Sequence, residues 1–157
     1  MKPKVYIEST IPSYYIAKPS RDLIVAAHQQ LTKTWWDIIL PKIDPFISPF
    51  VLEEIARGDK NAAKLRLKAV GSFPVLDVTP EAEDLAEFYF KKTGIPEKAR
   101  TDSYHLALAT CHQMDFIVTW NCTHIASGPV KKIIEKINLQ KELWNPMICT
   151  PEELMEV

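Results

Sequence analysis

The 157-residue sequence predicts an α/β fold in which a central, mostly parallel sheet of four or five strands is flanked by helices. Two observations carry this prediction. Short β-rich runs alternate with helical runs along the chain, as in parallel sheets whose strands are joined by helices. The run "DFIVTW" (115–120) has a continuous apolar centre, which is typical of a strand covered on both faces. With no internal repeat and no linker, we expect one domain over residues 1–157.

The strands and helices follow from local signals. Strands are expected at 4–8, 45–48, 73–78, 115–120 and 147–149. Apolar residues at helical spacing predict a long helix that Ser20 caps and that runs to about Leu40. Other helices are expected at 10–17, at 49–58, from Asp59 to near Gly71, from Thr79 to Gly94, from Thr101 or Asp102, and from about Pro129. "TPEE" (150–153) is a capping box with proline at the first helical position.

The composition is that of an ordinary globular protein. Hydrophobic residues make up 46% and charged residues 25%, and the formal net charge is −1, so affinity for nucleic acid requires a local basic face. The three cysteines lack CxxC spacing, which favours reduced thiols over disulfides or a zinc site. No signal peptide and no membrane-spanning stretch is recognised, so we expect a cytoplasmic protein without membrane association.

Unusual polar residues fall where the predicted strands end. Glu8 closes the first strand, Glu54 lies in the helix after the second, Asp102 begins the helix before the fourth, and Asn121 follows the fourth. The carboxyl ends of parallel strands meet at one edge, where α/β proteins place their sites. Each residue also has a structural alternative: Glu8 as a strand-end acid facing solvent, Asp102 as a helix cap, Asn121 as a turn former, and either Glu53 or Glu54 on a solvated helix face.

Three segments carry a resemblance to a known family. "VYIESTIPSYY", "SPFVLEEIARG" and "TDSYHLALATCHQMDFIVTWNCTHIA" resemble, in this order, the PIN-domain nucleases, and among them the VapC-type toxins of toxin–antitoxin pairs. The third segment is the most specific, with an acid, a histidine three residues later, small residues through the helix, and then Thr-Trp-Asn after an apolar strand. The resemblance covers essentially the whole chain and implies a PIN-like fold.

The resemblance also implies a function and a set of catalytic residues. It implies an Mg²⁺- or Mn²⁺-dependent endoribonuclease that works as a homodimer and is inhibited by a cognate antitoxin. Glu8, Glu54 and Asp102 match the first three acids and are the expected metal ligands, and Asn121 matches the fourth position. This chain departs from the family at two positions. The first acid is usually Asp and is here Glu8, and the fourth residue is often Asp and is here Asn121. Carboxylates suit hard cations such as Mg²⁺ and Mn²⁺, so the chemistry agrees with the resemblance.

Neighbouring residues extend this candidate site. Thr10 and Thr119, together with Ser9, are expected either to hold metal-bound water, to orient a carboxylate, or only to satisfy turn backbone. His124 is a candidate phosphate or metal-water contact, whereas His105 is expected to be a packed or surface histidine. Cations that could line an RNA-binding crevice include Arg100, and the aromatic residues Tyr14, Tyr15 and Trp120 either stack on bases or pack.

Three rival functions remain open at this point. The departures at Glu8 and Asn121 fit a PIN-like module that binds RNA or protein without cutting it. A different acid-cluster phosphohydrolase would hydrolyse small phosphate esters and ignore RNA. A response-regulator-like domain needs a lysine after a later strand, and Thr119-Trp120-Asn121 offers none.

Overall fold

The computed structural model describes residues 1–157 and contains one sheet of four parallel strands. In spatial order these are β2 (Asp44–Phe46), β1 (Lys4–Ile7), β3 (Phe116–Val118) and β4 (Met147–Cys149). In register, Tyr6 lies beside Phe46 on one side and beside Ile117 on the other. The predicted α/β class with a parallel sheet is confirmed.

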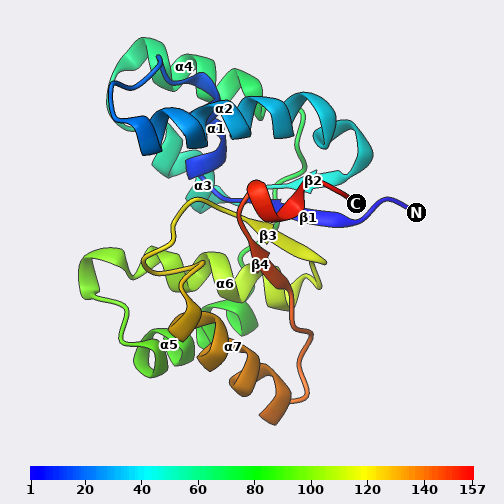
Figure 1. Cartoon of the computed structure of the whole chain (residues 1–157). Helices are drawn as coiled ribbons and strands as arrows, with labels where there is room; N and C mark the ends of the chain where they lie inside the picture. Colours follow the sequence, from blue (N-terminus) through cyan, green and yellow to red (C-terminus); the bar gives the residue numbers. More distant parts are fainter.

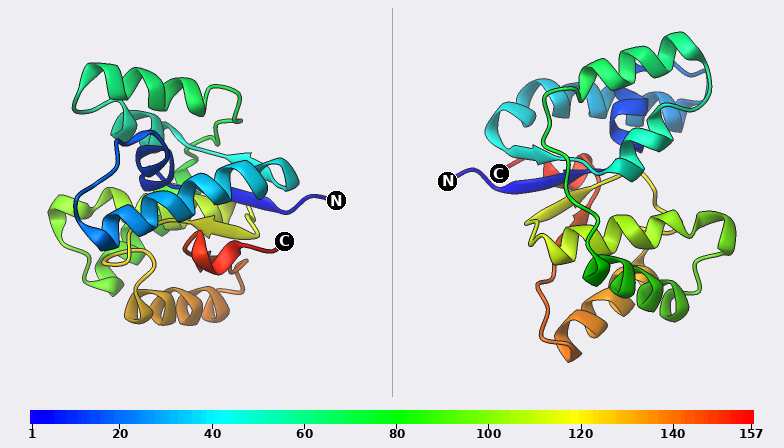
Figure 2. Two further views of the ribbon diagram at one scale, coloured as in Figure 1. Left: turned by 45° about the horizontal axis from the view of Figure 1, so that its top comes forward. Right: turned by 180° about the vertical axis from the view of Figure 1, so that it is seen from behind.

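Helices cover both faces of the sheet. One layer holds α1 (Thr10–Ile16), α2 (Leu23–Ile38), α3 (Pro49–Ile55) and α4 (Lys60–Ala69), shown above the sheet in Figure 1. The other holds α5 (Pro80–Thr93), α6 (Thr101–Cys111) and α7 (Gly128–Gln140), and the rotated views of Figure 2 show the same division. Three 3₁₀ turns complete the chain: η1 (Leu40–Lys42), η2 (Glu97–Ala99) and η3 (Glu152–Leu154).

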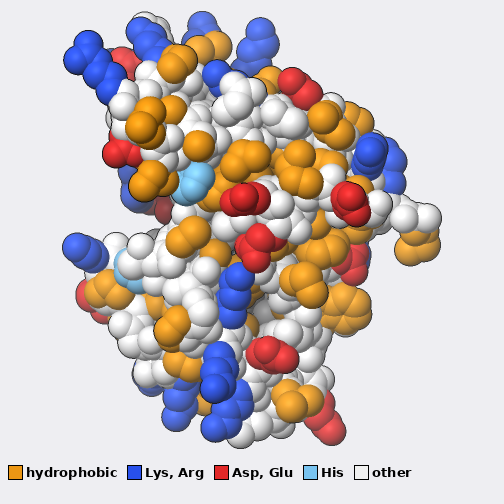
Figure 3. Space-filling model, in the orientation of Figure 1, with side chains coloured by type: hydrophobic (Ala, Val, Ile, Leu, Met, Phe, Trp, Pro, Cys, Tyr) orange, Lys and Arg blue, Asp and Glu red, His pale blue; other side chains and the backbone are white.

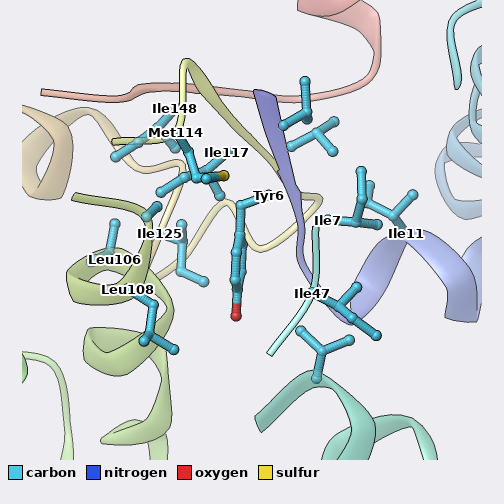
Figure 4. Close-up of a cluster of buried hydrophobic side chains, with 14 of the residues drawn as sticks. Tyr6, Ile7, Ile11, Ile47, Leu106, Leu108, Met114, Ile117, Ile125 and Ile148 are labelled. Carbon is cyan, nitrogen blue, oxygen red and sulfur yellow. The ribbon is translucent and has the colours of Figure 1, made fainter. Parts of the chain in front are cut away.

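Because both faces are covered, consecutive side chains of β1 are buried on opposite sides. Figure 4 shows Tyr6 pointing toward α6, among Leu106, Leu108 and Ile117, while Ile7 points the other way, toward Ile11 of α1. Both strand residues are fully buried. This arrangement explains why the strand is apolar at successive positions instead of alternating.

Three predicted elements need correction. Residues 73–78 are not a strand: they make a single bridge between Ile47 and Val75, because Pro74 has no N–H to donate to a ladder. The long helix is capped by Asp22, whose carboxylate accepts from Val25 N at 2.9 Å, and not by Ser20. The capping box at the C-terminus does form, since Thr150 and Glu153 bond reciprocally, but the turn after it is only the three residues of η3.

All four strands run in one direction, so their carboxyl ends lie at one edge of the sheet. At that edge, on the left of Figure 3, the surface is notched between the two helical layers. None of the helices combines the length and the apolar character required to traverse a bilayer.

Candidate metal centre

Glu8, the first residue after β1, is buried under the hydroxyls of three neighbours. Its Oε1 accepts from the Thr119 hydroxyl at 2.6 Å, from the Thr10 hydroxyl at 2.5 Å and from Thr10 N at 3.1 Å. Its Oε2 accepts from the Ser9 hydroxyl at 2.7 Å. The side chain is only 2% exposed, so these bonds replace water around a buried carboxylate. Oε1 is thus saturated, and Oε2 is the oxygen with capacity to spare.

Glu54 lies on α3 and points toward Glu8, whereas its neighbour Glu53 faces solvent and pairs with Arg57 at 3.0 Å. Glu54 Oε1 lies 2.6 Å from His105 Nε2. Burial by itself would raise the pKa of Glu54, but the hydrogen bond and the charge of His105 outweigh it, so the pKa lies below its ordinary value. The pKa of His105 is raised in turn: burial opposes this, and its hydrogen bond to Glu54 and three nearby carboxylates overcome the opposition.

Asp102 lies in the first turn of α6 but does not cap it. No side chain caps this helix, and the carboxylate instead accepts from Asn121 Nδ2 at 3.1 Å and lies 3.1 Å from His124 Nδ1. Asp102 is 7% exposed, and this burial is the main reason that its pKa is raised. The negative charges of Glu8 and Glu54 raise the pKa further, which is expected for acids gathered without a counter-ion.

Two of the three predicted acids meet at one edge of the sheet, together with a histidine. Glu8, Glu54 and His105 each offer a ligand atom, and these atoms all lie within 4.8 Å of one another. Asp102 is outside this group and bonds Asn121 and His124, although the charges of both glutamates and of His105 act on its pKa. Buried carboxylate oxygens that repel one another fit a hard divalent cation, which would remove the repulsion.

The residues predicted around the acids occupy two different positions. Thr10 and Thr119 hold Glu8, and each also accepts a backbone N–H from the loop after β3: Thr10 from Trp120 at 2.8 Å, Thr119 from Asn121 at 2.9 Å. These hydroxyls therefore both contact a carboxylate and satisfy turn backbone, which fits two of the three expected roles. Asn121 and His124 lie together at Asp102, because His124 N also donates to Asn121 Oδ1 at 2.9 Å.

Arg100 and Trp120 both contact other side chains within the fold. The Arg100 guanidinium forms a two-pronged ion pair with Glu97, contacts Glu87, and lies 3.9 Å above the Phe90 ring. Contact with RNA, which stays a prediction, would require these pairs to open. Trp120 is 8% exposed, and the His28 ring stacks on it at 4.0 Å, so the tryptophan face is already covered.

The hydrogen bonds of His105 to Tyr6 and Glu54 could not be read from the sequence. His105 was expected to be a packed or surface histidine, and it is indeed fully buried, yet both of its ring nitrogens are hydrogen-bonded. Its position three residues after Asp102, on the same side of α6, was the available signal.

Comparison with known proteins shows the fold and no more. No protein-family model matches the chain, and no curated protein matches it. Among solved structures, the chain is similar to one in the crystal structure of VapBC2 from Rickettsia felis bound to a DNA fragment from their promoter. The TM-score is 0.59 at 13% sequence identity, over 94% of this chain and 98% of the other. At this identity the similarity shows that the chain has the fold of a chain of that complex.

Proposed function

We propose that this protein is a metal-dependent endoribonuclease of the PIN type, with Glu8, Glu54 and Asp102 as the ligands of Mg²⁺ or Mn²⁺. The observation that supports the proposal is the meeting of Glu8 and Glu54 with His105 at the carboxyl edge of the sheet, in a fold similar to that of a VapBC2 chain. The choice of Asp102 as the third ligand rests on the sequence resemblance. A bound divalent cation would neutralise a phosphate oxygen and lower the pKa of a water molecule.

The chain's own side chains have complementary parts in this proposal. The hydroxyls of Ser9, Thr10 and Thr119 fix the Glu8 carboxylate, so Glu8 would hold a cation with a side chain that is already oriented. Asn121 and His124 hold Asp102 through contacts to its Oδ2. His124, which is partly exposed, is the candidate for contact with the scissile phosphate.

The proposal includes a biological setting. From the sequence resemblance to VapC-type toxins and the fold shared with a chain of the VapBC2 complex, we infer a toxin that a cognate antitoxin protein holds inactive and that forms a homodimer. Light scattering of the purified chain tests the dimer, because a monomeric mass at micromolar concentration contradicts it.

An RNA-cleavage assay with a neighbouring-residue control tests the nuclease. The purified protein is incubated with a mixed RNA pool in Mn²⁺, in Mg²⁺ and in EDTA. Cleavage is expected only with a metal, is expected to vanish in Glu54→Gln, and is expected to persist in Glu53→Gln, whose side chain faces solvent. Cleavage that survives in EDTA or in Glu54→Gln contradicts the proposal.

One observation favours a second candidate, a PIN-like module that binds RNA or protein without cutting it. The fourth position is the neutral Asn121, whose amide donates to Asp102 Oδ2 and which adds no negative charge to the site. This alternative predicts RNA retention on a filter with no product in any metal. Hydrolysis of p-nitrophenyl phosphate in place of RNA would favour a small-ester phosphohydrolase.

A further inference from the structure

A chain of buried hydrogen bonds leads from one end of α3 to the other. The Ser48 hydroxyl lies 2.7 Å from the Tyr6 hydroxyl, which lies 2.5 Å from His105 Nδ1, and His105 Nε2 lies 2.6 Å from Glu54 Oε1. Ser48, Tyr6 and His105 are each 0% exposed. Figure 4 shows the Tyr6 ring within the apolar cluster, so its hydroxyl carries a polar path through the core.

The acceptor at one end orders the hydrogens of the chain. An ionised Glu54 only accepts, so a hydrogen must be on His105 Nε2. With a neutral imidazole, Tyr6 donates to Nδ1 and accepts from the Ser48 hydroxyl, which itself accepts from Val51 N at 3.4 Å as the cap of α3. With a protonated imidazole, Nδ1 donates to Tyr6 and Tyr6 donates to Ser48. In both states every buried polar atom of the chain has a partner.

The same bonds determine what His105 can do. Both ring nitrogens are engaged, by Tyr6 and by Glu54, so neither is free to bind a cation. Glu54, by contrast, keeps its second oxygen, and its side chain is 23% exposed. The imidazole is therefore the buried partner of a glutamate that solvent can reach.

We propose that His105, fixed by Tyr6 and Ser48, is a positioning residue that orients Glu54 for the divalent cation and is not itself a metal ligand. This inference rests on the proposed function, since it assigns a task to a residue that is hydrogen-bonded to the proposed metal ligand. Groups that orient a ligand in this way typically change metal affinity 10- to 100-fold.

Two buried tyrosines give a matched test. Tyr6→Phe removes one hydroxyl from the chain that leads to Glu54. Tyr89→Phe removes a hydroxyl that is equally buried but bonds Thr110 of α6 and Asn138 of α7 and has no bond to the Glu54 chain. Calorimetric titration with Mn²⁺ should show about tenfold weaker binding in Tyr6→Phe and unchanged binding in Tyr89→Phe. Equal affinities in the two variants overturn the proposal.

A second pair of variants addresses His105 directly. His105→Gln keeps an amide donor near the place of Nε2 and should recover part of the Mn²⁺ affinity that His105→Ala loses. Pulsed EPR of the Mn²⁺-loaded protein should show no nitrogen coupling from this residue. A nitrogen coupling that is present in the wild type and absent in His105→Gln makes His105 a ligand and overturns the proposal.

The metal-free protein separates this inference from the proposed function. If the wild type binds no Mn²⁺, the metal proposal fails, and ¹⁵N NMR of His105 still decides whether the chain exists. A hydrogen fixed on Nε2 and an Nδ1 resonance that moves in Tyr6→Phe but not in Tyr89→Phe support the chain. An Nδ1 resonance that does not shift in Tyr6→Phe overturns the proposed hydrogen-bond chain.

Discussion

The Thr119 hydroxyl donates a 2.6 Å hydrogen bond to Glu8 Oε1 although 111 positions of the chain separate the two residues. Thr119 follows β3 and Glu8 follows β1, and these strands are neighbours in the sheet. The bond therefore reports directly on strand order. It also shows how a buried carboxylate is held by hydroxyls supplied from the ends of two strands.

Replacing Thr119 by valine should weaken both the fold and the metal site. The variant leaves a buried Glu8 oxygen and the Asn121 N–H short of a partner, so the free energy of unfolding should fall by about 1–3 kcal/mol. Urea unfolding measures this loss. Thr110→Val is the matched control, because that hydroxyl is also buried but bonds Tyr89 and Leu106. Both variants should lose stability, and only Thr119→Val should also lose Mn²⁺ affinity.

Asp102→Asn should abolish RNA cleavage without lowering the thermal midpoint of the metal-free protein. Burial and the charges of Glu8 and Glu54 hold the pKa of Asp102 above its ordinary value, so its ionised form is a destabilising element at neutral pH. A neutral amide removes that repulsion. Calorimetry should therefore give an equal or higher midpoint. A clearly lower midpoint would show that the carboxylate acts mainly as a structural acceptor for Asn121 and His124.

Mn²⁺ should stabilise the wild type against unfolding. A ligand that binds only the folded state at 100 times its Kd adds about 2.7 kcal/mol, and the thermal midpoint should rise accordingly. Glu54→Gln should lose most of this increase and Glu53→Gln none, because only Glu54 faces the other acids. The same increase in both variants would place the ion elsewhere.

The contribution of the Glu54–His105 pair to the free energy of unfolding should follow a bell-shaped curve with pH. The pKa of Glu54 is lowered, so its contribution is present above its unfolded pKa of about 4.3 and is lost as the pH falls through the folded value. The pKa of His105 is raised, so its contribution is complete below about 6.5 and is lost as the pH rises through the folded value. The difference in unfolding free energy between wild type and Glu54→Gln, without metal, should peak between these limits. A pH-independent difference contradicts the ion pair.

Most of the secondary structure could be predicted because its signals are local. Pro49 after Ser48 begins α3, and Thr79-Pro80 begins α5, which ends at Gly94 with φ of 74°, a conformation that suits glycine. The prediction of a strand at 73–78 is wrong. Its apolar pattern is that of a strand, but Pro74 has no backbone N–H for the hydrogen bonds between strands. The cap of α2 was assigned to Ser20 instead of Asp22 because both residue types cap helices and their spacing differs by two positions.

The candidate site was predictable in outline and not in its bonds. Parallel strands place their carboxyl ends at one edge, so the sequence alone could indicate that Glu8, Glu54, Asp102 and Asn121 lie near one another. It could not indicate that Asp102 accepts a hydrogen bond from Asn121 and does not cap the N-terminus of α6. That choice depends on the path of the loop after β3, which packs on residues far away in the chain.

The sequence by itself determined the α/β class, the places where helices begin and end, and the positions of acids after the strands, because each depends on residues a few positions apart. Only the tertiary structure decided that Tyr6, Ser48 and His105 form one buried path to Glu54, and that Thr119 reaches Glu8. Contacts that join residues 42 to 111 positions apart depend on strand order and on the direction of each side chain. Both are fixed when the whole core packs, and no local pattern encodes them.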